Sequence, residues 1–208
     1  MQEIKNSTAY KIAMKEKVLD MAIFMFTNQG IKAVKMDDIA CALQISKRTL
    51  YELYANKEDL LLEGLKKHMK LRPEELREMA MKQCNVMDII LNVFCRKVEE
   101  YQKTNPLFYD DIVRYPKVLE HFEKERLKNQ SQMENFMTRG MDEGYFRKDV
   151  NYNLISIMFD KLHKIIMTNR LYVTYSMEEI LKGIIFVFLR GVCTEKGIKV
   201  MDEFLAKD

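Results

Sequence analysis

Turn-forming residues are scarce in this chain, whose 208 residues include 7 glycines and 3 prolines. Sandwiches and barrels join many short strands by tight turns, and disordered linkers are rich in the same two residues, so the scarcity argues against all of these. Methionine, leucine, isoleucine, lysine and glutamate dominate instead, a composition that favours helix. Because 48% of the residues are hydrophobic, a chain of this length can bury a sizeable core. We therefore expect an all-α protein.

Membrane insertion and a disulfide framework are both disfavoured. The longest strictly apolar run, Ile184–Leu189, is far shorter than the ~20 residues that a membrane-spanning helix needs. The first residues lack the apolar core of a secretion signal. The four cysteines have no C-x-x-C spacing, which is typical of free thiols in a reducing compartment. We expect a cytoplasmic protein without a membrane partner.

Charge is distributed unevenly along the chain. Residues 1–72 contain 13 lysines and arginines against 9 acidic residues, a balance of +4, whereas the rest contains 21 against 22, a balance of −1. A basic first third beside a neutral remainder is typical of a module that faces a polyanion such as nucleic acid. The same imbalance also arises by chance, so charge alone leaves both interpretations open.

No catalytic constellation is present in the sequence. It contains no phosphate-binding glycine loop, dinucleotide-binding fingerprint, zinc-protease motif or nucleophile elbow. Its three histidines, His68, His121 and His163, have no metal-ligand spacing. We expect no catalytic residues, no metal site and no cofactor.

The first third of the chain carries the apolar spacing and the capping residues of short helices. Val18, Ala22 and Phe26 repeat at helical intervals, and Gly30 is placed to end that helix in the left-handed region. Asn56 is placed to cap a further helix. This region is expected to be a compact group of helices.

Two short helices are expected between these two, joined across a tight break at Gln44 and Ile45. The first covers about Met36–Leu43, and Ser46 caps the second, which runs to about Leu53. These are the proportions of a helix-turn-helix, although a small helical bundle without any role in DNA binding has the same spacing.

The residue types decide between these two interpretations. The motif positions are Val18-Leu19, Ala22, Phe26, Gly30, Asp38-Ile39-Ala40, Ser46, Thr49-Leu50-Tyr51, Tyr54, Lys57-Glu58 and Leu60. With these residues, the segment 17–61 resembles the N-terminal domain of the TetR/AcrR family of transcriptional regulators. Two positions depart from the family pattern: Lys35 stands where a capping Ser or Thr is frequent, and Gln44 stands where Gly is frequent.

The resemblance implies a two-part architecture. An N-terminal three-helix helix-turn-helix DNA-binding domain is expected over residues 11–71, with the motif itself at about 35–54. A larger helical ligand-binding and dimerisation domain is expected over 72–208. The implied function is a homodimeric repressor that a small apolar inducer releases from its double-stranded DNA operator. Two alternatives stay open: a helical ligand-binding or interaction protein that does not recognise DNA sequence, and a DNA-binding activator.

The expected DNA contacts come from the leading end of the recognition helix, because that end enters the major groove first. Arg48 can offer a two-pronged hydrogen bond to guanine. The resemblance implies that Lys35 and Lys57 touch phosphates and that Tyr51 touches backbone or base. The full set of predicted DNA-binding residues is Lys35, Ser46, Lys47, Arg48, Thr49, Tyr51 and Lys57.

Capping residues and prolines also divide the rest of the chain. Helices are expected over 86–103 after an Asn85 cap, from Pro106, over 116–142, from Asn151 or Asn153, and from Ser176 as the last major helix. The Ser176 helix carries Ile180, Ile184 and Phe188 and is apolar on nearly all sides, so it is buried on more than one side. The resemblance implies that the last two long helices form a four-helix dimer interface with the same pair of a partner, and burial within the monomer is the alternative.

Aromatic and methionine side chains of the middle helices are the candidates for an inducer pocket, which the resemblance implies. Flexible methionines suit an adaptable apolar lining. The same residues at helical spacing are also typical of an ordinary core, so both interpretations stay open. The predicted ligand-binding residues are Phe94, Tyr101, Phe108, Tyr115, Met133 and Met137.

Overall fold

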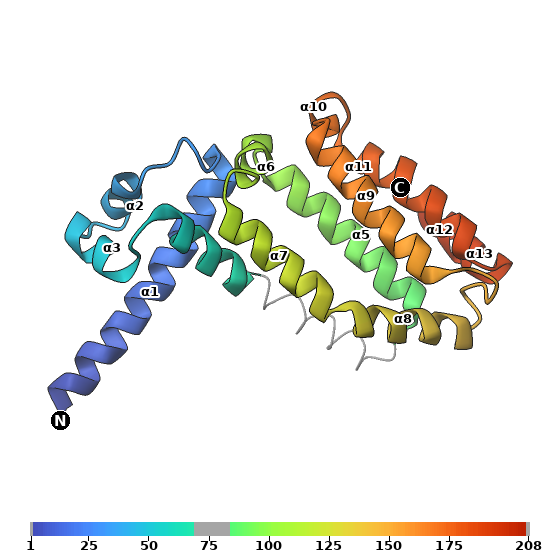
Figure 1. Cartoon of the computed structure of the whole chain (residues 1–208), viewed down its shortest axis with the longest axis horizontal. Coiled ribbons are helices and arrows are strands. Elements are labelled where there is room, and N and C mark those ends of the chain that lie inside the picture. The colour runs from blue at the N-terminus through green and yellow to red at the C-terminus, as the bar shows by residue number, and fades with distance from the viewer. Residues whose placement is uncertain (1, 69–83, 207–208) are drawn as a thin grey trace. The chain divides into compact units, whose positions relative to one another are not determined.

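A computed structural model of the chain describes residues 2–68 and 84–206 (Figure 1). Within these ranges every regular element is a helix, apart from an isolated bridge between Phe146 and Cys193, so the all-α prediction is confirmed. The chain divides into two compact units. The first unit combines Met1–Arg72 with Thr104–Lys124, and the second combines Pro73–Lys103 with Glu125–Asp208. The predicted boundary at 71/72 falls outside the described residues and stays a prediction.

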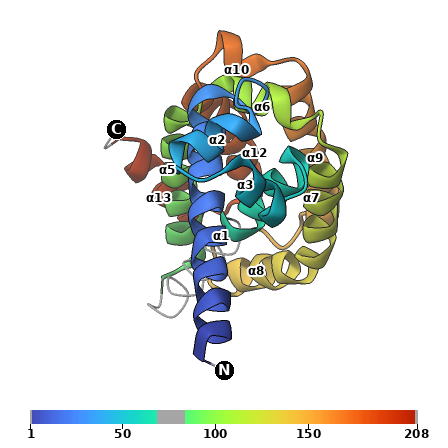
Figure 2. The same ribbon diagram turned by 90° about the vertical axis from the view of Figure 1, so that its left-hand side faces the viewer.

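The first unit is built around one long helix. Helix α1 (Gln2–Gln29) is followed by α2 (Met36–Ala42), α3 (Lys47–Leu53) and a helix over residues 57–68. Helix α6 (Pro106–Ile112) and most of α7 (Pro116–Lys128) complete the unit. The first turns of α1 extend beyond α2 and α3, as Figure 2 shows.

The core of the first unit follows the predicted apolar positions. Val18, Ala22 and Phe26 of α1 are fully buried. Gly30 ends the helix with a φ of +88°, in the left-handed region that glycine adopts without strain. The core is completed by residues of the other helices, including Ile31, Val34, Ile39, Leu50, Leu60, Leu61, Phe108 and Val118.

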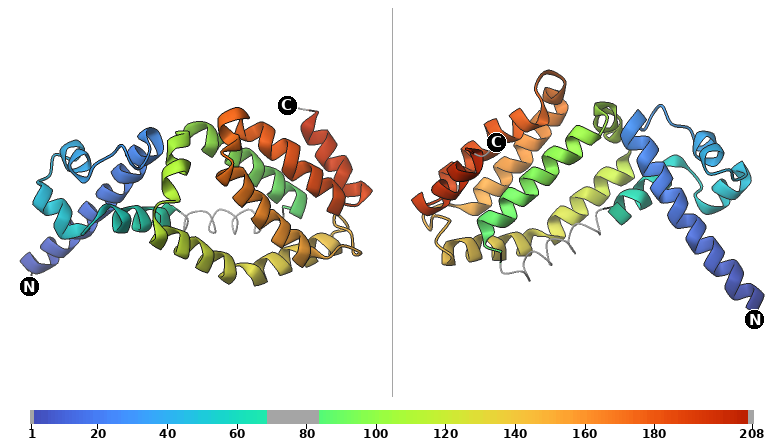
Figure 3. Two further views of the ribbon diagram at one scale, coloured as in Figure 1. Left: turned by 45° about the horizontal axis from the view of Figure 1, so that its top comes forward. Right: turned by 180° about the vertical axis from the view of Figure 1, so that it is seen from behind.

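The second unit is a bundle whose core combines aliphatic side chains with Phe94, Phe146 and Phe186. Helix α5 (Val86–Lys103) packs against α8 (Gln130–Asp142), α11 (Met177–Ile180) and α13 (Glu195–Leu205). Helix α9 (Tyr152–Thr168) and the short α10 (Leu171–Thr174) precede α11. The rings of Phe159 and Phe188 lie 5.5 Å apart, which places α9 beside the chain segment after α11 (Figures 1 and 3).

Capping predictions in this unit are confirmed. The Asn85 side chain accepts hydrogen bonds from the amides of Met87 at 2.9 Å and Asp88 at 3.0 Å. Asn151 caps α9. Ser176 and Glu179 form a reciprocal capping box at the start of α11.

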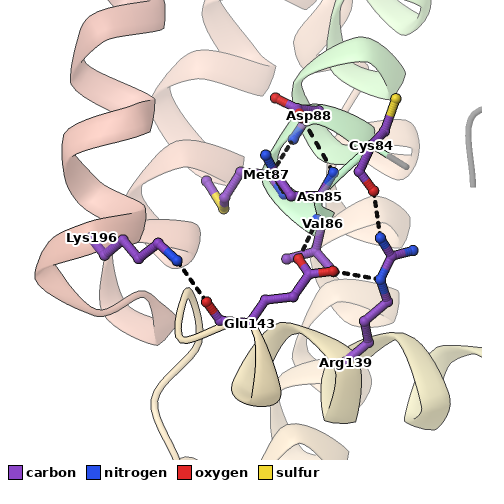
Figure 4. Close-up of polar contacts among 8 residues, drawn as sticks. All are labelled: Cys84, Asn85, Val86, Met87, Asp88, Arg139, Glu143 and Lys196. Atoms are coloured by element: carbon purple, nitrogen blue, oxygen red, sulfur yellow. Dashed lines mark hydrogen bonds and ion pairs between the residues drawn. The ribbon is translucent and has the colours of Figure 1, made fainter. Parts of the chain in front are cut away.

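The N-terminus of α5 is also held by the C-terminal end of α8 (Figure 4). The Glu143 carboxylate accepts hydrogen bonds from the Val86 amide at 2.8 Å and from Arg139 Nε at 2.6 Å. The Arg139 guanidinium also donates to the Cys84 carbonyl, and Lys196 Nζ donates to the Glu143 carbonyl at 2.8 Å. Arg139 and Glu143 therefore fix the start of α5, and Lys196 of α13 holds Glu143 in turn.

Two predicted helices differ from the structure. The helix expected over 116–142 is two helices, α7 and α8, because Asn129 has a ψ of −1° and bends the chain away from helical geometry. The helix expected from Ser176 changes type, since α11 continues into a π-helix, η1 (Leu181–Phe186), and then into α12 (Val187–Val192). It is not the last major helix either, because α13 follows after a Thr194 cap.

Candidate nucleic-acid interface

The turn between α2 and α3 is closed by backbone hydrogen bonds. The amide of Gln44 donates to the Cys41 carbonyl and that of Ile45 to the Ala40 carbonyl, each at 3.0 Å. Gln44 has a φ of +53°, so a side chain occupies the left-handed position that glycine usually fills. This conformation costs a non-glycine residue about 1–2 kcal/mol, which the rest of the turn must offset.

The cap of the recognition helix forms as predicted. Ser46 Oγ accepts a hydrogen bond from the Thr49 amide at 3.0 Å, and the two hydroxyl groups lie 2.8 Å apart. Leu50 is fully buried and anchors the helix in the core of the first unit. The cap and this anchor together fix which face of α3 is turned to solvent.

Two cations lie at the exposed, N-terminal end of α3. The side chains of Lys47 and Arg48 are 68% and 89% exposed. Lys47 is paired with Asp37, and Arg48 Nε donates to Glu52 Oε1 at 2.9 Å. These hydrogen bonds are the main reason that the pKa of each cation is raised above its ordinary value. Exposed pairs of this kind are weak, so both cations can exchange their partners for other anions.

Two further predicted residues lie exposed in the same helix-turn-helix. Tyr51 is exposed on α3, one turn after Lys47. Lys35 is exposed at the N-cap of α2, where its side chain makes no capping hydrogen bond, as its residue type implies. The Asp38 carboxylate accepts from the Lys35 amide at 2.8 Å instead.

Lys57 has a different environment from the other cations. Its ammonium donates hydrogen bonds to the carbonyls of Ile31 at 2.6 Å and Val34 at 2.7 Å. Burial lowers the pKa of this lysine, against the opposing effect of Asp111 and Asp38. Its expected phosphate contact stays a prediction, because the structure holds no DNA against which to test it.

The six predicted ligand residues are divided between the two units. Phe108 and Tyr115 pack in the core of the first unit, whereas the other four belong to the second unit. Phe94 is buried against the rings of Phe186 and Phe204, with edge-to-face centroid distances of 4.8 and 6.0 Å. Phe94, Phe108 and Tyr115 therefore show ordinary core packing, which is the alternative that the sequence left open.

The remaining ligand candidates differ in exposure. Tyr101 lies under the Lys97 ammonium, Met137 packs against the core, and Met133 is exposed. A hollow of about 240 Å³ does lie on the first unit, but none of the six lines it; its lining residues are Leu19, Asp20, Ile23, Phe24, Gly64, Lys67 and His68. The position of an inducer pocket therefore stays a prediction.

Large apolar side chains lie exposed on two helices of the second unit. Leu154, Ile157, Met158 and Ile165 are exposed on α9, and Val187 is exposed on α12. We call these five residues the α9–α12 face. On α9 the other three residues lie three, four and eleven positions after Leu154, which places them on one side of the helix and was a signal for such a face.

The described residues contain neither a metal-binding cluster nor a membrane-spanning helix. Within residues 2–68 and 84–206, no group of His, Cys, Asp or Glu side chains is arranged to hold a metal ion. None of the helices described is long and apolar enough to cross a bilayer.

Comparison with known proteins finds a described family that matches part of the first unit. Residues 18–63 match the family of bacterial regulatory proteins described as tetR. The HTH-type transcriptional repressor KstR2 of Mycobacterium tuberculosis is 26% identical over 144 residues, which cover 67% of this chain and 72% of that protein. The biofilm operon regulator IcaR of Staphylococcus epidermidis, an HTH-type negative transcriptional regulator, is 40% identical over 47 residues, 23% of this chain and 25% of its own.

A solved structure supports the fold over most of the chain. A TetR-family transcriptional regulator from Marinobacter aquaeolei has a TM-score of 0.64 and 17% identity, over 91% of this chain and 98% of its own. The resemblance drawn from the sequence is therefore confirmed.

Proposed function

Since residues 18–63 belong to the tetR family of bacterial regulatory proteins, we propose that this chain is a homodimeric transcriptional repressor of the cytoplasm. Its operator is double-stranded DNA, and a small apolar molecule releases it. The observation that carries the proposal is the pair of exposed cations, Lys47 and Arg48, at the N-terminal end of a capped recognition helix.

DNA binding follows from what these side chains can reach. A recognition helix enters the major groove with its N-terminal residues first. Arg48 presents a fork of donors that matches the two acceptors of guanine, while Lys47 supplies a point charge for a phosphate. Asp37 and Glu52 hold both cations in exposed pairs until DNA offers better acceptors. Lys35, on the preceding helix, serves a phosphate.

The other predicted contacts divide by role. Tyr51, exposed on the same helix, can stack on or donate to the DNA backbone. Ser46 and Thr49 are hydrogen-bonded to each other at the N-cap of α3. Their contribution is to order the first turn of this helix and to offer their hydroxyl oxygens to a donor group on the DNA. The sequence preference therefore rests mainly on Arg48.

A dimer is required because two half-sites need two recognition helices. The α9–α12 face is the surface that we assign to it, since large apolar side chains lie exposed on two neighbouring helices. Gly183 and Gly191 lie four residues before and after Val187, and a Cβ built on either glycine meets no atom within 4 Å. A partner helix can approach closely there.

Regulation requires two states of this dimer. In one state the recognition helices have the spacing of successive major-groove turns, ~34–36 Å. A ligand of the second unit favours the other state, and it can shift the balance only by its difference in affinity for the two. Tyr101, Met133 and Met137 are the ligand residues that we retain for this role, because they belong to the second unit and are not among its buried core residues.

DNA binding is tested by a mobility-shift titration with the DNA beside the chain's own gene, against a shuffled DNA of equal length. The native protein is expected to prefer the first DNA, and Lys47→Ala to bind it more weakly. Lys103→Ala is the matched control, because Lys103 is an equally exposed cation, paired with Glu99 on α5 of the second unit. Equal affinity of the native protein for both DNAs would favour the interaction protein that lacks sequence recognition.

A further inference from the structure

The loop between α1 and α2, residues 31–35, is held from inside the first unit by Lys57. This lysine lies at the start of the helix over residues 57–68. Its ammonium donates to the carbonyls of Ile31 and Val34, at 2.6 and 2.7 Å. An ammonium has three donors, so two of the three are used within the protein. The side chains of Ile31 and Val34 are fully buried, and the loop is therefore anchored by both its apolar and its polar groups.

A buried carboxylate holds the same loop from α6. Asp111 is 7% exposed and accepts a hydrogen bond from the Lys32 amide at 2.6 Å. Helix α6 is also in close contact with the end of α1, since a Cβ on Gly30 would lie 2.9 Å from Leu107 Cβ. Asn105 adds two more contacts, from its amide to the Thr27 carbonyl at 2.7 Å and from its side chain to the Asn28 carbonyl at 3.1 Å.

The charge of Asp111 favours the charged form of Lys57. Burial lowers the pKa of Lys57, and the charge of Asp111 opposes that effect. A partly buried ammonium is costly unless its donors are satisfied, and the two carbonyls satisfy it here. This arrangement points the cationic end of Lys57 into the protein, whereas Lys47 and Arg48 extend their charges into solvent.

The loop determines where the DNA-binding helices lie. It leads directly into Lys35 and α2, and α2 packs against both α1 and α3. Ile39 and Ala40 of α2 are buried in the core with Leu50 of α3, so a displaced loop would move the two helices together. Groups that fix the loop therefore fix the position of the recognition helix.

We propose that Lys57 is a positioning residue for DNA binding: together with Asp111 it fixes the loop of residues 31–35, and so α2 and α3, rather than neutralising a DNA phosphate. The inference rests on the proposed function, since it concerns operator affinity. The family expectation is that Lys57 contacts a phosphate, and the two roles differ in a measurable way. The slope of log K against log salt is negative, and each lost phosphate contact makes it shallower by about 0.9.

The test is a salt series of operator affinities for the native protein, Lys57→Met, Asp111→Leu and Lys47→Met, with thermal unfolding of each. Lys57→Met keeps the aliphatic stem and removes the ammonium. We expect Lys57→Met and Asp111→Leu to bind about ten- to a hundredfold more weakly at every salt concentration, with the native slope. Lys47→Met is expected to lower the slope by about one, which shows that the assay detects a lost phosphate contact.

Hydrogen exchange of the free proteins gives a second readout that requires no DNA. The amide of Lys32 is expected to exchange faster in both Lys57→Met and Asp111→Leu than in the native protein. A salt slope reduced by about one in Lys57→Met would overturn the positioning role. So would native affinity of a folded Lys57→Met whose only defect is lower thermal stability. Failure of the native protein to bind operator DNA would overturn the proposed function itself and the inference with it.

Discussion

Replacing Val187 by Glu tests the dimer at a position where the fold of the protomer is not at risk. Val187 is 63% exposed at the start of α12, so a glutamate there reaches water in the isolated chain. In the dimer, the same carboxylate would be pressed into the partner's apolar face. The substitution should therefore weaken association and leave each protomer folded.

The expected magnitude follows from the exposed area. Burying a whole valine contributes about 1.5–3 kcal/mol, so the exposed part of Val187 contributes about 1 kcal/mol in each protomer. A carboxylate left without a partner in an apolar contact costs at least ~1–3 kcal/mol more for each copy. A twofold dimer contains the contact twice, which gives a total of at least ~4 kcal/mol. Since 1.4 kcal/mol is a factor of ten, the dimer Kd should rise about a thousandfold or more.

Sedimentation velocity over a concentration series measures this change, with circular dichroism as the check on helical content. Leu127→Glu is the matched control, because Leu127 is 55% exposed on α7 and is not one of the five residues of the α9–α12 face. We expect Leu127→Glu to associate as the native protein does and Val187→Glu to sediment as a monomer. A Val187→Glu dimer with the native Kd would place the interface elsewhere.

Three other substitutions or modifications test separate parts of the structure. Arg48→Ala should relax the preference at one base pair of the operator, and identical sequences selected by native and variant proteins would refute base reading by Arg48. Gly140→Ala should cost about 1–3 kcal/mol and lower the melting temperature, because the new Cβ would lie 2.0 Å from the Phe146 ring; an unchanged melting curve would contradict this packing. Burial raises the pKa of the Cys193 thiol to about 11, so at about pH 8 iodoacetamide should modify the exposed Cys41 first. Mass spectrometry that finds Cys193 labelled first would argue against its burial.

Capping residues in the sequence were sufficient to predict where four of the helices begin. Ser46, Asn85, Asn151 and Ser176 all cap helices as predicted, because each bond joins a side chain to an amide two or three residues ahead. Such contacts depend on the sequence nearby and on nothing else in the fold. The start of the recognition helix α3 was predictable for this reason.

Features that depend on distant contacts were not predictable in the same way. Ile180 is buried within its own unit, and Val187 rather than Ile184 is strongly exposed, because a π-helix shifts the register between them. Phe108 follows the second unit's α5 in the chain but packs in the core of the first unit. The partners of Lys57 lie 23 and 26 residues before it, so its motif position alone does not reveal them.

Selection of binding sites from randomised double-stranded DNA tests the central claim most directly. The native protein, at a concentration where it is a dimer, is expected to enrich two inverted half-sites. Their centres should be one helical turn of DNA or a multiple of it apart, ~34–36 Å for a single turn. Enrichment of no sequence, or of one half-site without a partner, would contradict a dimeric repressor that reads DNA through α3.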